Sequence, residues 1–171
     1  LIPRKNHEVV IRALSVLKQR DKLSHIEYVI CGRGAYEADL KKLAEELGVA
    51  DHIYFLGYRN DISEICNCAD LFVFMSHQEG LPVALMEAMA CGLPAICSNI
   101  RGNTDLIEDG VCGLIVASTA EDVAVAVMQM WENPEMRYGM ATAALSAVKK
   151  FDLISVEMKM KEIYESVEVQ G

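Results

Sequence analysis

Short apolar runs alternate with helical patterns along the whole chain, and this alternation constrains the fold more than any other feature. The runs have no helical spacing, which is typical of strands buried in a parallel sheet. Between them, apolar residues recur three or four positions apart, as at Val10, Leu14 and Leu17. This order predicts an α/β fold with a Rossmann-like, doubly wound, mostly parallel sheet flanked by helices. The expected strands are residues 28–31, 52–56, 71–75, 94–97 and 113–116.

Capping signals locate several of the helices. Gly48 is expected to end one of them in a left-handed turn. Asp61 and Glu64 have the spacing of a capping box, and Ser118 and Glu121 mark another helix start. The expected helices are residues 6–20, 35–47, a short one from 61 that ends before 70, one from 82, and further ones from 118, 133 and 152.

The last predicted helix, about 152–167, has an apolar face of its own. We expect most of this face to pack on the domain, and any part left exposed to favour self-association. The face consists of Ile154, Met158, Ile163, Tyr164 and Val167.

Length, charge and cysteine content bound the class of protein. The 171 residues are enough for one domain, 1–171, with a sizeable core. A net charge of −9 argues against nucleic acid, which requires a basic patch. There is no signal-peptide pattern and no apolar run near the ~18 residues of a membrane span, so we expect a cytoplasmic protein. The six cysteines lack metal-ligand spacing, so we expect buried thiols, no metal and no cofactor.

The segment from 71 to 87 joins an apolar strand to a helix through a glycine and a proline. Pro82 suits the first helical position, and Gly80 allows the backbone to approach a ligand closely. The first-turn amides, including those near Leu81 and Val83, then point into a crevice at the carboxyl end of the strand. Unpaired N–H groups and the helix dipole attract anions there, so the segment predicts a phosphate site.

Two carboxylates flank this predicted anion site. Glu79 precedes the helix and Glu87 lies on its second turn. Ionised carboxylates only accept hydrogen bonds, so next to a phosphate they suit the hydroxyl groups of a ribose or hexose. The alternative is that Glu79 is a solvated loop residue and Glu87 a charge on the helix face. The glycine, the proline and the preceding strand favour the sugar interpretation.

A longer block, from Asp70 to Val116, surrounds these residues. It contains Glu-Gly-Leu-Pro-Val-Ala-Leu-Met-Glu at 79–87, Ala-Met-Ala-Cys-Gly-Leu-Pro at 88–94 and Arg-Gly-Asn-Thr-Asp-Leu-Ile-Glu-Asp-Gly at 101–110. The block resembles retaining glycosyltransferases of the GT-B fold, in the large group-1 branch known as family four. The resemblance runs over the whole chain but covers only the C-terminal, donor-binding half of such an enzyme. It implies that a strand with a phosphate-binding arginine, and before it an acceptor-binding domain, precede Leu1.

The resemblance also implies roles for single residues. Glu79 is expected to orient the transferred sugar as the catalytic residue of this half, and Glu87 to bind the ribose hydroxyls. The Gly80–Val83 amides, together with Lys5, are expected to neutralise the diphosphate. The alternative for Lys5, as for Arg4 beside it, is a solvated charge near the chain end. Many relatives have glycine where this chain has Asn6, which we expect to cap the helix that follows.

Two further loops match the nucleotide pocket of the family. Gly32 and Gly34 follow a strand, and Glu37 stands where a dinucleotide fingerprint needs glycine, so a nicotinamide cofactor is not expected. In the family a similar pair lines the nucleotide pocket; the alternative is a tight strand-to-helix turn. Tyr58 and Arg59 lie in the segment that holds the base in relatives, and the alternative is plain surface exposure.

Asn103 and Thr104 lie after the strand at 94–97. They belong to a loop at the carboxyl end of the sheet, where open α/β sheets bind ligands. We therefore expect them to contact the sugar or the phosphates.

These expectations combine into a donor-binding domain. The partner is a nucleotide sugar, expected to be a UDP-sugar, from which the full-length enzyme transfers a hexosyl group to a glycan or lipid-linked acceptor. The fragment alone is expected to bind donor weakly and to transfer nothing, and any membrane association belongs to the absent half. A non-catalytic nucleotide-sugar module and a sugar-nucleotide epimerase on the same fold are the alternatives. Epimerases lack the Glu-Gly-Leu-Pro block.

Overall fold

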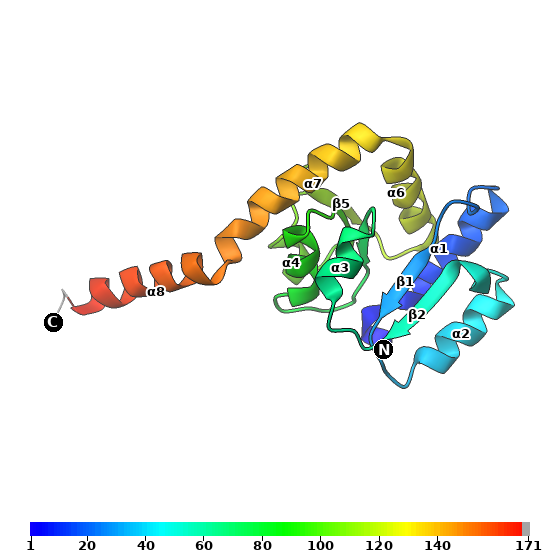
Figure 1. Cartoon of the computed structure of the whole chain (residues 1–171), viewed down its shortest axis with the longest axis horizontal. Coiled ribbons are helices and arrows are strands. Elements are labelled where there is room, and N and C mark those ends of the chain that lie inside the picture. The colour runs from blue at the N-terminus through cyan, green and yellow to red at the C-terminus, as the bar shows by residue number, and fades with distance from the viewer. Residues whose placement is uncertain (169–171) are drawn as a thin grey trace.

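The computed structural model describes residues 1–168, except the side chains of Leu153 and of residues 166–168. Helices and strands alternate as predicted, and each predicted element begins within two residues of its observed start (Figure 1). In chain order the elements are η1 (Pro3–Lys5), α1 (His7–Gln19), β1 (Tyr28–Cys31), α2 (Glu37–Glu46), η2 (Ala50–His52), β2 (Ile53–Gly57), α3 (Ile62–Asn67), β3 (Phe72–Phe74), α4 (Val83–Ala90), β4 (Ala95–Ser98), α5 (Arg101–Thr104), β5 (Gly113–Val116), α6 (Ala120–Glu132), α7 (Pro134–Val148), η3 (Lys149–Phe151) and α8 (Leu153–Glu168).

The strands form two parallel sheets instead of one. β1 pairs with β2, with Tyr28 opposite Ile53. β4 lies between β3 and β5, with Ile96 opposite Val73 and Leu114. Parallel pairing confirms the predicted fold class, but within residues 1–168 β1 and β3 do not pair, so a single continuous sheet is not observed. A doubly wound sheet carries its first strand in the middle. The strand expected before Leu1 would lie between β1 and β3, and that expectation stays a prediction.

The N-terminal segment and a shared core hold the two sheets together. The backbone N of Leu1 bonds to the carbonyl of Arg33 after β1, and the carbonyl of Arg4 accepts the N–H of His77 after β3 at 2.9 Å. One cluster of buried apolar side chains contains residues from both sheets, including Ile30 and Ile96. The segment that contains η1 therefore spans the carboxyl ends of both sheets.

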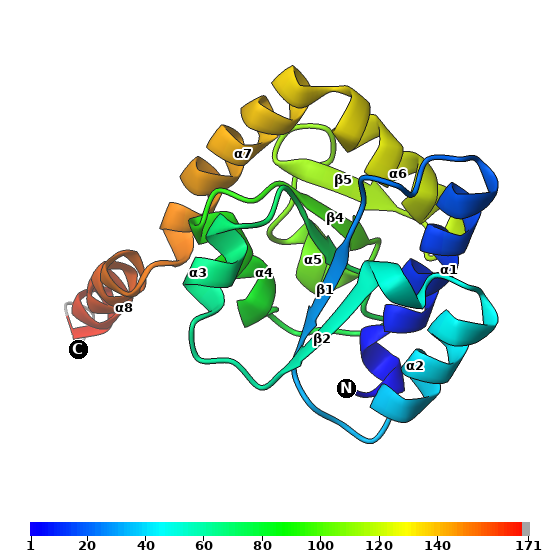
Figure 2. The same ribbon diagram turned by 45° about the vertical axis from the view of Figure 1, so that its right-hand side comes forward.

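Helices cover the sheets in two groups. α1 and α6 pack against each other, and α4 packs against α7 (Figure 2). The buried face of α1 carries the predicted apolar residues, and Leu17 is fully buried. Leu85 and Met89 are the corresponding fully buried residues of α4. This packing fixes α4 relative to the sheet of β3, β4 and β5.

Three capping predictions need correction. Asp61 makes no side-chain cap and instead pairs with Arg59. The cap of α6 is Thr119, one residue after Ser118, and its Oγ1 accepts the N–H of Asp122 at 3.1 Å. Asn6 precedes α1 without a side-chain cap, because its φ of 53° is left-handed. Asparagine tolerates this conformation better than most residues, so it replaces glycine by backbone geometry and not by capping.

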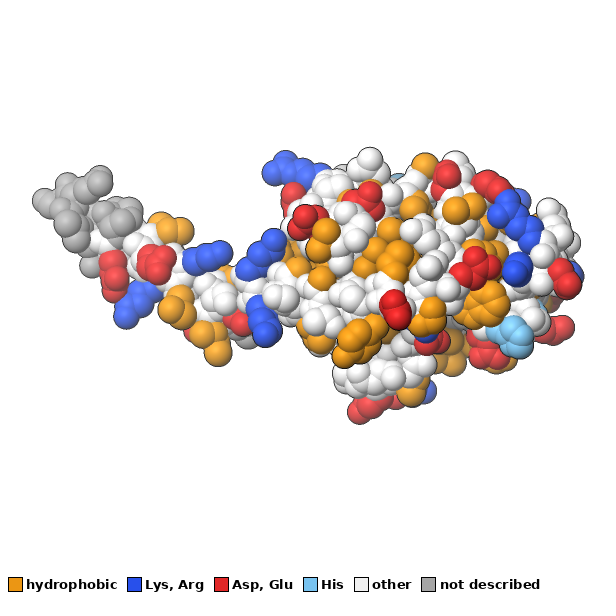
Figure 3. Space-filling model, turned by 90° about the horizontal axis from the view of Figure 1, so that it is seen from above, with side chains coloured by type: hydrophobic (Ala, Val, Ile, Leu, Met, Phe, Trp, Pro, Cys, Tyr) orange, Lys and Arg blue, Asp and Glu red, His pale blue; other side chains and the backbone are white. Residues whose placement is uncertain are grey.

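The terminal helix α8 projects away from the body of the domain, in red at the left of Figure 1. The prediction that most of its apolar face packs on the domain is therefore wrong for the described side chains: Ile154, Met158, Ile163 and Tyr164 are more than 60% exposed. Apolar side chains remain visible along this helix in the space-filling view (Figure 3). The side chain of Val167 lies outside the described residues. Across residues 1–168, no helix combines the length and apolarity that a membrane span requires.

Cysteines are unpaired, and their burial varies. The expectation of buried thiols holds for Cys66, Cys97 and Cys112. It is wrong for Cys31 and Cys91, which are half-buried, and for Cys68, which is exposed just after the end of α3. Burial raises the pKa of Cys66 to about 11 and that of Cys97 to about 12, so both are neutral thiols at pH 7. The residues described contain no group of three or more potential metal ligands, and the expectation of a metal-free site stays a prediction.

Candidate functional site

Glu79 lies in the loop between β3 and α4, where it forms ion pairs with the N-terminal turn η1. Its Oε1 lies 2.7 Å from Nζ of Lys5, and its Oε2 lies 3.4 Å from Nη1 of Arg4. The Glu79 side chain is only 10% exposed. The structure thus places the predicted catalytic carboxylate directly against the predicted phosphate-binding lysine, across 74 residues of sequence.

Arg4 attaches η1 to this loop through its backbone as well as its side chain. Its Nη1 donates to the carbonyl of Gln78 at 2.6 Å, and its own carbonyl accepts the N–H of His77. Together with the contact to Glu79, these bonds connect Arg4 to three consecutive residues of the loop. Sequence reasoning gave Arg4 no specific partner.

Burial and positive charge act in opposite directions on Glu79. Burial alone raises the pKa of a carboxyl group, but the hydrogen bond from Lys5 and the charges of Lys5 and Arg4 outweigh it, so the pKa of Glu79 lies below its ordinary value. The Ser76 hydroxyl contributes in the same direction, although its Oγ atom makes no hydrogen bond of standard geometry. Glu79 is therefore an ionised acceptor at neutral pH.

A buried polar cluster lies beneath the loop. The Oγ of Ser98 donates to the carbonyl of Ser76 at 2.5 Å, and Nδ2 of Asn103 donates to the carbonyl and Oγ of Ser98 at 3.0 and 3.1 Å. These bonds tie the ends of β3 and β4 to α5. Asn103 is fully buried, so in this conformation it supports the loop and does not reach solvent. Its predicted contact with the donor stays a prediction that requires local movement.

Gly102 brings α5 against the backbone of the loop. A Cβ atom at this position would lie 2.6 Å from the carbonyl oxygen of Gly80 and 2.9 Å from that of Glu79. Sequence reasoning missed Gly102, Ser76 and Ser98. For the two serines a signal was present, because each is a polar residue directly after an apolar run in the sequence.

The start of α4 has the predicted form with a shift of one residue. Pro82 is the residue before the helix and not its first residue, and it is buried. Leu81 and Val83 are 51% and 60% exposed, so this turn lies at the surface of the domain. A Cβ at Gly80 would meet no atom within 4 Å, so the space above the loop is open. Glu87 lies on the second turn of α4 with an exposed side chain.

Gly32 and Gly34 lie at the carboxyl end of β1. Gly32 has a φ of 126° and donates its N–H to the carbonyl of Gly57 at 2.7 Å. A Cβ at Gly34 would overlap the backbone of Leu1. The close backbone approach at Gly34 is therefore made to the N-terminal residue of this chain.

The remaining predicted residues are at the surface. Tyr58 is 68% exposed and is free to stack. Arg59 binds Asp61, with Nε 2.8 Å from Oδ1, and this pair raises the pKa of Arg59 and lowers that of Asp61. Thr104 is exposed, and its Oγ1 donates to the carbonyl of Arg101 within α5, which the sequence predicted as a loop.

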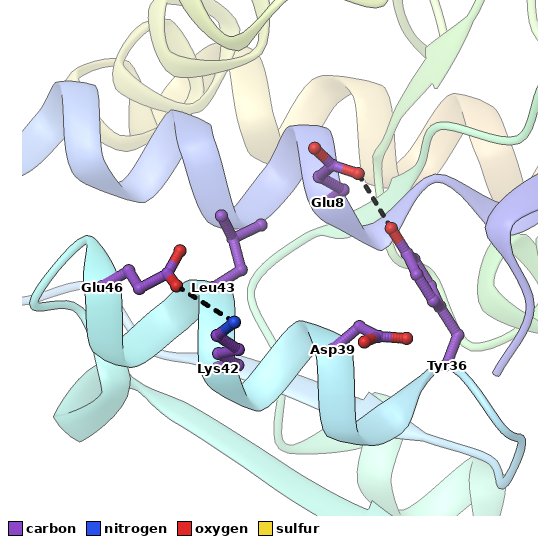
Figure 4. Close-up of a pocket in the computed structure, with 6 residues that line it drawn as sticks. All are labelled: Glu8, Tyr36, Asp39, Lys42, Leu43 and Glu46. Atoms are coloured by element: carbon purple, nitrogen blue, oxygen red, sulfur yellow. Dashed lines mark hydrogen bonds and ion pairs between the residues drawn. The ribbon is translucent and has the colours of Figure 1, made fainter.

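The best-formed cavities in the described part of the chain lie elsewhere. One of about 190 Å³ lies between α1 and α2, where Tyr36 donates to Glu8 at 3.0 Å (Figure 4). Another, of about 550 Å³, lies between the segment after α5 and helix α7. Neither is lined by Glu79 or Glu87.

The chain matches one family of known proteins in sequence and in structure. The family model described as glycosyl transferases group 1 matches residues 1–146. The putative glycosyltransferase EpsD of Bacillus subtilis (strain 168) is 32% identical over 161 residues, which cover 94% of this chain and 42% of EpsD. An Escherichia coli protein named UDP-Gal:alpha-D-GlcNAc-diphosphoundecaprenol alpha-1,3-galactosyltransferase is 28% identical, over 96% of this chain and 43% of its own length.

Among solved structures, Anabaena Alr3699/HepE in complex with UDP superposes with a TM-score of 0.89 at 23% identity. The match covers 97% of this chain and 46% of HepE, so it establishes a shared GT-B fold. The same protein was also solved with UDP-glucose. The chain spans less than half the length of each of these three relatives.

Proposed function

Because the chain belongs to the glycosyl transferases of group 1, we propose that it binds the UDP-sugar donor of a retaining glycosyltransferase, which transfers a hexosyl group to a glycan or lipid-linked acceptor. The observation that carries the proposal is the pairing of Lys5 with Glu79 at 2.7 Å beside the start of α4. It brings a cation for phosphate and a carboxylate for hydroxyl groups to one place.

Each group at this place has a role that follows from its chemistry. The Lys5 ammonium and the backbone N–H groups of the segment 80–83, in which the proline contributes none, neutralise the diphosphate, including the charge that develops as the sugar leaves. Glu79 is ionised and nearly buried, so it accepts hydrogen bonds from the hydroxyls of the transferred sugar and orients that sugar. Glu87, on the second turn of α4, accepts hydrogen bonds from the ribose hydroxyls.

A uridine donor is supported by the solved complexes of HepE with UDP and UDP-glucose. It is also supported by the E. coli relative, whose name specifies UDP-Gal. The exposed Tyr58 offers a ring on which a base can stack beside the glycine-rich end of β1.

The exposed start of α4 fits a site completed by more polypeptide than the 171 residues contain. The relatives are more than twice as long as the segment they share with this chain. The acceptor and the groups that activate it belong, in this proposal, to the remaining part of the full-length enzyme. We therefore expect the chain alone to bind donor weakly and to transfer no sugar.

Calorimetry with UDP, UDP-glucose, GDP and GDP-mannose tests the proposal. UDP and UDP-glucose should bind, and Glu87→Gln should weaken UDP binding about tenfold, since a charged acceptor of two hydroxyls is lost. Glu45→Gln, an exposed substitution on α2, is the matched control and should leave affinity unchanged. Absence of binding to every uridine and guanosine ligand, or equal affinities of the Glu87→Gln variant and the original chain, would refute the assignment.

A further inference from the structure

We propose that the Glu79 carboxylate occupies Lys5 as an internal substitute for the diphosphate, that the arriving ligand displaces it, and that Arg4 is the positioning residue that keeps Glu79 in place during this exchange. The inference rests on the proposed function and adds to it a ligand-coupled exchange of ion pairs. It assigns different tasks to two adjacent cations, of which only Lys5 touches the phosphates.

The two oxygens of Glu79 have different partners. Oε1 faces Lys5 at 2.7 Å, whereas Oε2 faces Arg4 at 3.4 Å. When Lys5 moves to the diphosphate, Oε1 of Glu79 is freed, while Oε2 keeps its contact with Arg4. The freed Oε1 becomes available to a sugar hydroxyl at the time when the diphosphate has taken Lys5.

Arg4 is attached to the loop more firmly than Lys5. Its guanidinium also holds the carbonyl of Gln78 at 2.6 Å, and its backbone carbonyl accepts the N–H of His77. Lys5 has one ion pair with the loop, and its Nζ lies 5.0 Å from the centre of the Phe74 ring. A planar guanidinium holds two acceptors in fixed geometry, whereas an ammonium on four flexible carbons is free to turn toward a new anion.

Charge favours the exchange. A diphosphate carries more negative charge than one carboxylate, and about a third of the Lys5 side chain is solvent-accessible, so an incoming anion can reach it. Before the ligand binds, the ion pair gives both Lys5 and Glu79 a partner of opposite charge. The cost is competition: diphosphate binding must overcome the Lys5–Glu79 pair.

Competition through Lys5 predicts a particular result with inorganic pyrophosphate, which has neither sugar nor ribose. Glu79→Gln should bind pyrophosphate roughly two- to fivefold more tightly than the original chain, within the range expected for a single ion pair. Simple relief of repulsion would also tighten binding. The decisive comparison is therefore the same substitution in a Lys5→Met background, where competition through Lys5 is impossible and the gain should disappear.

The experiment measures pyrophosphate and UDP affinities at fixed ionic strength for the original chain, Glu79→Gln, Lys5→Met, the double variant and Glu87→Gln. If Glu79→Gln raises the affinity for pyrophosphate only when Lys5 is present, the result supports the exchange. A gain of equal size in the Lys5→Met background, or none in either, overturns it. If Glu87→Gln weakens UDP binding while Glu79→Gln has no effect, the proposed function stands and this inference fails. If no variant binds UDP or pyrophosphate, both fail.

Side-chain NMR of the original chain gives a second test that needs no substitution. On addition of pyrophosphate the Lys5 ammonium signal should shift, while the Arg4 guanidinium signals stay near their ligand-free positions. If both cations shift together, or if only Arg4 shifts, the division of tasks between them is wrong.

Discussion

Substitution of Gly102 by alanine tests whether α5 supports the Glu79 loop. The new Cβ would lie 2.6 Å from the carbonyl oxygen of Gly80 and 2.9 Å from that of Glu79. Ordinary contact begins at 3.4 Å, so the Gly80 carbonyl must move by about 0.8 Å, the difference between 3.4 and 2.6 Å. Because both obstructing atoms are backbone, a side-chain rotation cannot relieve the clash.

The expected cost follows from two opposing effects. Overpacking of this kind destabilises proteins by about 1–3 kcal/mol. Alanine is preferred over glycine in helices by up to about 1 kcal/mol, and Gly102 lies within α5, so part of the cost is offset. We expect a net loss of about 1–2 kcal/mol in the free energy of unfolding. The displaced loop should also weaken UDP binding roughly tenfold, because Glu79 and the Gly80 backbone move together.

Urea unfolding and UDP calorimetry on Gly102→Ala measure these two effects. Gly139→Ala is the matched control, because Gly139 lies in α7 and a Cβ there meets no atom within 4 Å. The control should gain about 0.5–1 kcal/mol and bind UDP normally. If Gly102→Ala unfolds at the same urea concentration as the original chain and binds UDP equally well, the proposed support of the loop by α5 is incorrect.

Two further predictions concern stability alone. Burial and, to a smaller extent, the positive charge of Lys5 lower the pKa of His7 from 6.5 to about 4, so between these pH values the unfolded chain binds a proton that the folded chain does not. This contribution to the free energy of unfolding should be fully present above pH 6.5 and fall by up to about 3 kcal/mol as the pH drops toward 4. Urea unfolding across this pH range measures it. A His7→Gln variant whose free energy of unfolding falls equally steeply with pH would contradict the prediction. Thr119→Ala removes the N-cap of α6 and should lower the free energy of unfolding, measured by thermal unfolding, by about 1 kcal/mol. Ser118→Ala should stay within about 0.5 kcal/mol of the original chain. Equal losses at both positions would show that the cap is misassigned.

The secondary structure around the candidate site was predictable from local sequence. The step from a strand through Gly80 and Pro82 into a helix depends on backbone preferences within a few residues, so Glu79 and Glu87 were placed correctly along α4 and its loop. Capping was less predictable. Asp61 has the right spacing, yet it pairs with Arg59, because a nearby guanidinium competes with the helix N–H groups for the same oxygens.

The sequence by itself determined the order of strands and helices and the family, because periodicity, turn residues and the block from 79 to 110 are local properties of the chain. Only the tertiary structure decided which groups meet. A shared core and the bond from the His77 N–H to the Arg4 carbonyl bring Lys5 to a carboxylate 74 residues away. Packing of α5 buries Asn103 and sets Gly102 against the loop. It also leaves the apolar face of α8 exposed. Such contacts depend on how separate elements dock, and no pattern within one element encodes that.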